Sequence, residues 1–326
     1  MGLDPVRIRE NIEHLGKTEA QTMLREWIVS SEDNFKRREA LEVYISLDDG
    51  KNFRFYEQLF LTDEDEEIRN LAGLSLKQNY ISDKRLLILL KFILEEQKQL
   101  EIKPNLFAIE LLNSINKKRA RKILREYLEK FFGIIVEKKI ENKKLQVLKE
   151  SIISNLDHNS PLSRELLEIL INLRLAVYYE QGCGYNVKMI ENFIVQLNCE
   201  GANISDISEI YDLDKLNRLI YLNLHRNKIK RVDNLSNLKD LISLNLSENK
   251  LQNIECESYD GLNNLIELDL ASNQIKKIEP FTLENLTKLS LDRNLISEIT
   301  NLNDLKNLEY LNLSHNHIER IQGLHT

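Results

Sequence analysis

Few residues in this chain have the types and the spacing that catalysis or metal binding requires. The three cysteines, Cys183, Cys199 and Cys256, show no Cys-x-x-Cys spacing, so they indicate neither a disulfide framework nor a zinc site. A thiolate nucleophile at Cys183 would need a neighbouring base, and the nearby sequence supplies none. His315 and His317 flank one asparagine and could imitate a metal pair, although their positions favour a strand end and a turn. We therefore expect no catalytic residue, no metal and no cofactor.

The absence of longer catalytic motifs also argues against an enzyme. The sequence contains no phosphate-binding loop, no zinc-protease motif, no serine-hydrolase elbow and no dinucleotide-binding glycine fingerprint. The acidic run 63–67 could attract a cation, but the solvated start of a helix explains it without one. An enzyme within these residues is not expected.

One basic stretch has two interpretations. Its residues are Lys117, Lys118, Arg119, Arg121, Lys122 and Arg125, followed by Lys138, Lys139, Lys143 and Lys144. Basic residues at a helix start oppose the helix dipole, which fits an anionic partner such as an acidic protein, RNA or lipid headgroup. The interspersed glutamates instead fit an ordinary solvated surface, and both interpretations stay open. A net charge of -7 argues against a general nucleic-acid binder.

The secondary structure that would carry binding residues is most clearly predicted from about residue 194 onward. There the motif Leu-x-x-Leu-x-Leu-x-x-Asn-x-Ile/Leu occurs five times. Its asparagines are Asn227, Asn249, Asn273, Asn294 and Asn316, which are 22, 24, 21 and 22 residues apart. A degenerate earlier copy runs over residues 194–204.

The spacing of this motif predicts the structure of each repeat. Leu-x-Leu predicts a short strand whose alternate side chains point inward, with one strand per repeat stacked into a parallel sheet. The asparagine is predicted to be buried, with its amide bonded to the backbone of the neighbouring repeat. Because one repeat cannot bury its apolar face alone, the array is stable only as a stack.

The motif resembles that of leucine-rich-repeat proteins. The 22-residue spacing, with Val232, Leu235 and Leu238 in the return segment, is similar to the short subclass that includes a phosphatase regulatory subunit. The 24-residue repeat, with Tyr259 and Leu262, departs from that subclass and resembles a longer one. The resemblance implies a curved solenoid that binds proteins, and it implies no particular partner.

The concave face of such a solenoid is the predicted binding surface. Residues between the leucines of each strand point outward, and they include Tyr and Arg, which are enriched at binding hot spots. The candidate partner-binding residues are Tyr221, Asn223, His225, Arg226, Glu248, Glu267, Asp269, Lys288, Arg293, Tyr310 and His315. The alternative is that any solenoid shows a polar concave face whether or not a partner uses it.

The N-terminal half is predicted to be helical. Ser31, Thr62, Ser82 and Ser160 are candidate helix starts. The expected helices cover about residues 31–45, 63–79, 82–94, 105–115, 117–131, 142–156 and 161–180. The pattern Arg37-x-x-Ala40 returns 32 residues later as Arg69-x-x-Ala72, a period similar to that of HEAT repeats. An irregular helical bundle is the alternative.

We place the domain boundary near Gly182, with a helical domain at 1–181 and a leucine-rich-repeat domain at 182–326. The 326 residues stop inside a repeat, at Gly323 to Thr326. Because the apolar face of that repeat would be bare, we expect a further repeat or a partner to cover it. The sequence shows neither a signal peptide nor a membrane-spanning run, and we expect a cytoplasmic protein with no membrane contact.

These observations predict a non-catalytic adaptor or scaffold that binds a protein partner. Two alternatives stay open. By analogy with the repeat subclass, the chain could be a regulatory subunit of a phosphatase or small GTPase. It could also be the binding portion of a longer enzyme whose catalytic domain lies beyond Thr326.

Overall fold

The computed structural model of the chain describes residues 3–96, 106–115, 117–137, 143–157, 160–254, 259–280 and 283–319. It contains two compact units, which part between Leu162 and Ser163. The first unit is helical, and the second holds one helix and all the strands. The predicted domain boundary at residues 181 and 182 falls at the C-terminal end of that helix, whereas the two units part at its N-terminal end.

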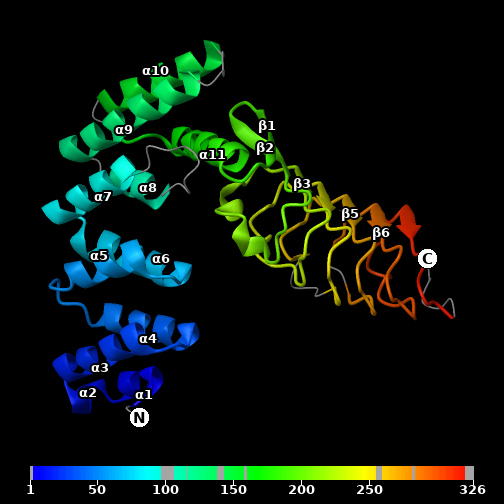
Figure 1. Cartoon of the computed structure of the whole chain (residues 1–326), viewed down its shortest axis with the longest axis horizontal. Helices are drawn as coiled ribbons and strands as arrows, with labels where there is room; N and C mark the ends of the chain where they lie inside the picture. Colours follow the sequence, from blue (N-terminus) through cyan, green and yellow to red (C-terminus); the bar gives the residue numbers. More distant parts are fainter. Residues whose placement is uncertain are drawn as a thin grey trace. The chain divides into compact units, whose positions relative to one another are not determined.

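The first unit is built from consecutive helices that pack on their neighbours, most extensively α3 on α4, α5 on α6 and α8 on α9 (Figure 1). Small side chains allow close packing, and Ala40, Ala72 and Ala108 are fully buried on α4, α6 and α8. The helices are α1 Pro5–Glu10, α2 Ile12–Leu15, α3 Lys17–Ser30, α4 Asn34–Ser46, α5 Phe53–Thr62, α6 Glu66–Tyr80, α7 Lys84–Glu96, α8 Leu106–Ile115, α9 Lys118–Glu137 and α10 Lys143–Asp157.

The two arginines of the predicted helical repeat have equivalent roles. On α4, the Nε atom of Arg37 donates to the carbonyl of Ile28, near the end of α3, over 2.8 Å. On α6, Nη1 of Arg69 donates to the carbonyls of Asp63 and Glu64, just past the end of α5, over 2.5 and 3.0 Å. Each arginine therefore satisfies carbonyls that the preceding helix leaves without an intrahelical partner. The sequence repeat thus corresponds to one helix pair.

Several predicted helix starts were wrong by a few residues. Asp33, and not Ser31, caps α4, and Thr62 is the last residue of α5 while Asp65 caps α6. The last helix begins after Ser163, whose hydroxyl accepts from the Leu166 amide, and not at Ser160. Each prediction chose the first of several capping residue types within a short segment. Which one caps depends on which side-chain oxygen reaches the N2 or N3 amide, and that is set by the local backbone.

Other helices also differ from the predictions, which named no helix before residue 31 and therefore omitted α1, α2 and α3. The helix α5 was not predicted, because its apolar residues are mainly aromatic and were not recognised as a helical stripe. The helix α9 continues to Glu137, six residues beyond the predicted end at residue 131.

Asp65 connects α4 to α6 as well as capping α6. Its Oδ1 atom accepts from the Ile68 amide over 3.1 Å. Its carboxylate also accepts two hydrogen bonds from Arg38 on α4, one from Nε over 3.1 Å and one from Nη2 over 2.6 Å. The residue is only 7 % exposed, so this paired charge is buried between two helix pairs.

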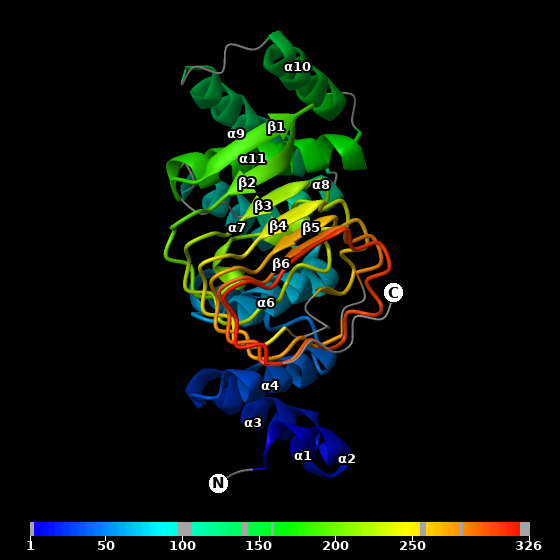
Figure 2. The same ribbon diagram turned by 90° about the vertical axis from the view of Figure 1, so that its right-hand side faces the viewer.

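The second unit is the predicted parallel solenoid. Its strands form one sheet in the order β1 to β7, in which only the first pair is antiparallel (Figure 2). Leu222 lies opposite Leu244, which lies opposite Leu268, so the repeats stack in the predicted register. The elements are α11 Arg164–Gln181, β1 Asn186–Ile190, β2 Phe193–Asn198, β3 Tyr221–Asn223, β4 Ser243–Asn245, β5 Glu267–Asp269, β6 Lys288–Ser290 and β7 Tyr310–Asn312, with short 3-10 turns at Ile207–Glu209 and Leu213–Lys215.

The predicted hydrogen bonds of the repeat asparagines are confirmed, and we call this stacked series of side chains the asparagine ladder. The Nδ2 atom of Asn273 donates to the carbonyl of Leu246 in the preceding repeat over 3.0 Å, and to Leu270 and Ala271 in its own repeat over 3.1 and 3.3 Å. Its Oδ1 atom accepts from the Leu251 amide over 3.0 Å. Asn227, Asn249, Asn294 and Asn316 repeat this arrangement. These side chains join each repeat to the one before it.

The N-terminal end of the solenoid is covered by α11 and by the β1–β2 hairpin. Asn172 on α11 accepts from the Ile194 amide of β2 over 3.0 Å, and the Tyr179 hydroxyl donates to the carbonyl of Tyr211 over 2.6 Å. The strand β1 was not predicted. Its tight turn uses Glu191 and Asn192, both with positive φ, and no glycine marks it. The predictions for Gly323 to Thr326 fall outside the described residues.

The buried thiol of Cys199 yields a direct check on the core. Cys199 is 1 % exposed, and burial raises its pKa far above the ordinary value, whereas Cys183 is half-buried. We expect iodoacetamide at mild alkaline pH to leave Cys199 unmodified in the folded chain and to modify it after denaturation, because the thiolate is the reactive form. Peptide mass spectrometry reads each site separately. Modification of Cys199 at the unfolded rate under native conditions would contradict the burial. Cys256 lies outside the described residues.

Candidate functional site

The first column of predicted binding residues lies along the outer face of the sheet. Tyr221 and Tyr310 stand at its two ends, 47 % and 49 % exposed. Between them, Nζ of Lys288 lies 3.8 Å from Oε1 of Glu267 and 6.0 Å from the centre of the Tyr310 ring. Ser243 lies next to Glu267, with 3.4 Å from Oγ to Oε2. The structure therefore brings this column together as one continuous polar surface with an aromatic side chain at each end.

The second column has a structural role in addition to its exposure. The side-chain oxygen of Asn223 accepts from the amide of His225, two residues further on, over 3.1 Å. Asp269 does the same with the Ala271 amide over 3.0 Å. The Nδ2 atom of Asn223 also donates to Asn198 over 2.9 Å. Because these hydrogen bonds shape the ends of the strands, Asn223 and Asp269 support the surface as much as they form it.

A charged cluster follows the first two of these strands. The Nε atom of Arg226 donates to Oε2 of Glu248 over 3.0 Å. The ring of His225 lies 2.8 Å from the Ser247 hydroxyl through Nδ1 and 3.8 Å from Oε1 of Glu248 through Nε2. The hydrogen bond from Arg226 lowers the pKa of the Glu248 carboxyl. The cluster joins two repeats across the surface and keeps Glu248 negatively charged.

This interaction predicts a measurable titration. Replacing Arg226 with glutamine should raise the pKa of Glu248 toward its ordinary value of 4.5, because the hydrogen bond and the positive charge are lost. Replacing Arg293, which contributes less to the same carboxyl, is the matched control and should raise the pKa of Glu248 less. Carbon-detected NMR of the glutamate carboxyl groups measures both. An unchanged titration in the Arg226→Gln variant would show that the pair does not persist in solution.

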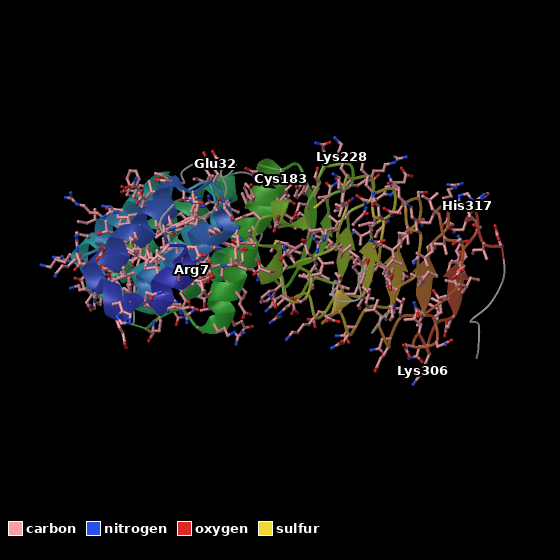
Figure 3. All side chains as sticks on the ribbon, turned by 90° about the horizontal axis from the view of Figure 1, so that it is seen from below. Arg7, Glu32, Cys183, Lys228, Lys306 and His317 are labelled. Atoms are coloured by element: carbon pink, nitrogen blue, oxygen red, sulfur yellow. The ribbon has the colours of Figure 1, made fainter. Side chains whose placement is uncertain are left out.

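The residue before each ladder asparagine has an unusual backbone. Arg226, Glu248, Ser272, Arg293 and His315 have φ values between 53° and 56°, in the left-handed region. Non-glycine residues adopt this region at a cost of about 1 kcal/mol. The fold therefore holds five charged or polar side chains at positions that glycine would occupy with less strain. Lys228 and His317, two residues past this position, lie along one margin of the solenoid, and Lys306 lies at the other (Figure 3).

One further column of outward residues, immediately N-terminal to the column of Tyr221 and Tyr310 on each strand, was not predicted from the sequence. The amides of Ile242 and Ser243 both donate to the carbonyl of Ile220, over 2.9 and 3.1 Å. Likewise, the amides of Ile266 and Glu267 both donate to the carbonyl of Ile242, over 2.8 and 3.0 Å. Two successive donors to one acceptor break the strict alternation of side chains, as in a β-bulge. The prediction assumed that side chains alternate strictly between the two faces of each strand, which would place Ile220, Ile242 and Ile266 on the inner face.

These isoleucines line an apolar groove of about 460 Å³. We give the name aliphatic strip to four of its apolar residues, Val195, Ile220, Ile242 and Ile266, which line it together with Ile190 and Phe193. Ile266 is 37 % exposed, Ile220 and Ile242 are half-buried, and Val195 is buried. The strip crosses the sheet from β2 to β5, directly beside the column that contains Tyr221 and Glu267.

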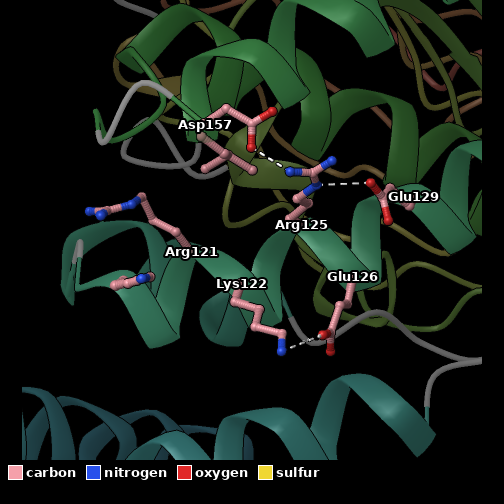
Figure 4. Close-up of a pocket in the computed structure, with 8 residues that line it drawn as sticks. Arg121, Lys122, Arg125, Glu126, Glu129 and Asp157 are labelled. Carbon is pink, nitrogen blue, oxygen red and sulfur yellow. Dashed lines mark hydrogen bonds and ion pairs between the residues drawn. The ribbon is translucent and has the colours of Figure 1, made fainter.

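The predicted basic stretch lines a separate groove of about 480 Å³ between α9 and α10 (Figure 4). Arg125 pairs with Glu129 over 2.9 Å and with Asp157 over 2.5 Å, and Lys122 lies 3.8 Å from Glu126. Carboxylates therefore neutralise part of this surface. Lys138 and Lys139, and the side chains of Lys143 and Lys144, fall outside the described residues. An anionic partner and a plain solvated surface both stay open.

Neither metal binding nor a membrane span is indicated in the part of the chain that the structure describes. His315 and His317 are exposed, and the described residues contain no group of three or more potential metal-ligating side chains. Across the same residues, each helix is either too short or too polar to cross a bilayer.

Matches to family models agree with the architecture of the second unit. Family models described as "Leucine Rich repeats (2 copies)" match residues 263–304 and 284–325, and one described as "Leucine rich repeat" matches residues 231–275. Dynein axonemal light chain 1 of Bos taurus and that of Rattus norvegicus are each 54 % identical over 43 residues. That segment is 13 % of this chain and spans about a quarter, 23 %, of those relatives. A crystal structure of a TLR13-ssRNA13 complex covers 40 % of this chain and 19 % of its own, with 28 % identity and a TM-score of 0.36.

The C-terminal part of the chain is therefore a solenoid of stacked strand-and-turn repeats that follows a helical repeat region. More particularly, its repeats are leucine-rich repeats, a class of module that generally binds proteins and does no chemistry itself.

Proposed function

We propose that the chain is a non-catalytic adaptor or scaffold that binds a protein partner on the outer face of its leucine-rich-repeat sheet. The observation that carries this proposal is the column from Tyr221 to Tyr310. Its two half-exposed tyrosines stand four strand spacings apart, about 19 Å, with Glu267 and Lys288 between them. Because the sheet fixes these side chains, little ordering entropy is lost when a partner binds.

The left-handed positions add support. Arg226 and Arg293 project from strained backbone positions beside the column, and arginine and tyrosine are enriched among the residues that dominate binding energy. Glu248 and His315 occupy equivalent positions in other repeats. We include these four residues in the binding surface, together with His225.

Further parts of the proposal rest on composition and resemblance. We propose a cytoplasmic location, a protein rather than a nucleic-acid partner because the net charge is -7, and a HEAT-like class for the helix pairs. The 43-residue segment shared with axonemal dynein light chains is about two repeats long. It therefore supports the repeat framework, and we infer no dynein-related partner from it.

A pull-down from native cell extract tests the binding surface. The intact chain is compared with a face variant that carries Tyr221→Ala, Arg226→Ala, Arg293→Ala and Tyr310→Ala. A control variant carries Lys230→Ala, Lys250→Ala, Lys277→Ala and Glu298→Ala, four exposed residues on the segments that follow the ladder asparagines. Circular dichroism must show all three chains folded.

We expect the control variant to retain a partner, identified by mass spectrometry, that the face variant loses. With the purified partner, the face variant should bind about thirtyfold or more weakly, the effect of losing one hot spot or more. Equal affinity of the two variants would move the site away from this face.

A regulatory subunit of a phosphatase or small GTPase is the second candidate, favoured by the 22-residue spacing of two of the four asparagine intervals. It requires that the recovered partner be such an enzyme and that its activity change when this chain is added. The third candidate, the binding portion of a longer enzyme, requires a catalytic domain beyond Thr326 in the full gene product.

A further inference from the structure

The aliphatic strip is a partly exposed apolar surface beside the polar columns of the sheet face, and its exposure rises from 8 % at Val195 to 37 % at Ile266. Its isoleucines occupy the same position in successive repeats, and the groove they line has a volume of about 460 Å³. The next two repeats place Thr287 and Glu309 at that position, so the strip is apolar at its β2 end and becomes polar toward β7. A partner that covers the strip would therefore place its apolar residues toward β2 and its polar residues toward β7.

The spacing of the strip fits a helix. Neighbouring strands lie about 4.8 Å apart, so Val195, Ile220, Ile242 and Ile266 stand at about 0, 4.8, 9.6 and 14.4 Å along the stack. A helix rises about 1.5 Å per residue, which puts its residues i, i+3, i+7 and i+10 at about 0, 4.5, 10.5 and 15 Å. An extended peptide presents one face only every 6.8 Å or so, and it would lose register after one strand.

Negative charge at the edge of the groove indicates that basic residues flank the apolar face of the bound helix. Carboxylates of Glu191 and Asp240 border the groove, and Glu309 follows at its polar end. None of the three makes an ion pair within the described part of the chain, so all are available to a basic partner. The rim cation, Arg218, is already stacked 3.6 Å over the centre of the Phe193 ring. The groove thus offers unpaired negative charge beside an apolar surface.

We propose that the aliphatic strip is the docking site for an amphipathic α-helix of a partner protein. The helix carries aliphatic side chains at i, i+3, i+7 and i+10, with lysine or arginine beside them. The helix lies along the stack, across the strands from β2 to β5. This proposal rests on the proposed function, because it names the class of partner that the same sheet face receives.

Selection from a displayed library of random 16-residue peptides, with the full chain as bait, tests the proposal. Enriched sequences should show aliphatic residues at the helical spacing and an excess of lysine and arginine. The synthetic peptide from the strongest sequence should gain helical circular dichroism on binding. Failure to enrich any sequence, or enrichment of sequences without helical spacing, would overturn the proposal.

Two matched variants localise the binding. Ile266→Asp places a charge in the strip, and Leu295→Asp makes the same change at an exposed leucine outside it, and the two wild-type side chains are 37 % and 40 % exposed. Ile266→Asp should weaken the selected peptide about tenfold or more, while Leu295→Asp leaves its affinity within about twofold. Asp240→Lys should weaken it about threefold at low salt and less at high salt. Equal binding by wild type and Ile266→Asp would overturn the proposal.

The outcome is separable from that of the proposed function. If the natural partner is lost by the face variant but retained by Ile266→Asp, the protein-binding face stands and the helix-docking strip is wrong. If neither change affects the natural partner, both proposals are wrong.

Discussion

Replacing Asn273 with alanine is expected to lower the free energy of unfolding of the second unit by about 4 kcal/mol. The substitution removes an amide that donates to Leu246, Leu270 and Ala271 and accepts from Leu251. The residue is 8 % exposed, so water cannot replace these hydrogen bonds without opening the stack. The buried Leu251 amide is left without a partner, which costs about 1 to 3 kcal/mol. The three carbonyls keep a second donor but each loses one hydrogen bond, worth about 0.5 to 1.5 kcal/mol.

Hydrogen exchange of peptides from β4 to β6, followed by mass spectrometry, measures this loss in the second unit alone. Asn285→Ala is the matched control, because Asn285 is exposed and makes one hydrogen bond, from Nδ2 to the Asn263 carbonyl over 2.7 Å. It should cost about 1 kcal/mol or less. Asn273→Asp keeps the shape but removes the donors and adds a charge, so we expect it to be as damaging as alanine. Equal protection in the Asn273→Ala and Asn285→Ala chains would refute the ladder as a stabilising device.

Replacing Asp65 with alanine should destabilise the first unit by about 3 kcal/mol. About 1 kcal/mol comes from the lost cap of α6. The remainder comes from leaving Arg38 without its bidentate partner between α4 and α6. Asp65→Asn keeps the cap and loses the charge, so it should lie between alanine and wild type. Asp83→Ala, which removes an ion pair with Arg85 and the hydrogen bond from the Arg85 amide at the start of α7, is the control and should cost about 1 kcal/mol.

The single tryptophan makes this experiment specific, because Trp27 lies in α3 and its fluorescence follows the first unit in denaturant. Its pH dependence adds a second check. Burial raises the pKa of Asp65, but the hydrogen bonds and charge of Arg38 and the hydrogen bonds from the Ile68 and Glu67 amides together hold the pKa below its ordinary value of 3.8. A depressed carboxyl pKa stabilises the fold above the unfolded value, and this contribution is lost as the pH falls through the folded value. The difference between wild type and Asp65→Asn should therefore shrink below pH 3.8.

The parts of the fold that the sequence predicted well are those built by repetition. Asn249 and Asn273 recur in phase with flanking leucines, and only a stacked sheet gives every copy the same buried environment. Strand positions, register and the ladder follow from that one constraint. In the helical unit, Arg37 and Arg69 were recognisable for the same reason, because each repeats one contact with the preceding helix.

The parts that it did not predict depend on single local events. The hairpin turn at Glu191 and Asn192 has no glycine to mark it, and the cap at Asp65 competed with three neighbouring polar residues. The aliphatic strip was missed for a different reason. Ile220 and Ile242 follow from a backbone irregularity that only the hydrogen-bond pattern reveals. The binding residues themselves stay predictions, since a polar strand face looks alike in sequence whether or not a partner uses it.

Site-specific photo-crosslinking in native extract tests the central proposal, partner binding on the sheet face, most directly. A benzophenone amino acid replaces Tyr221 or Tyr310 on the sheet face, or Lys277 or Glu298 on the segments that follow the ladder asparagines. We expect the same partner protein to be crosslinked from both tyrosine positions and from neither control position. Crosslinks of that partner from Lys277 or Glu298, with none from the tyrosines, would contradict the account.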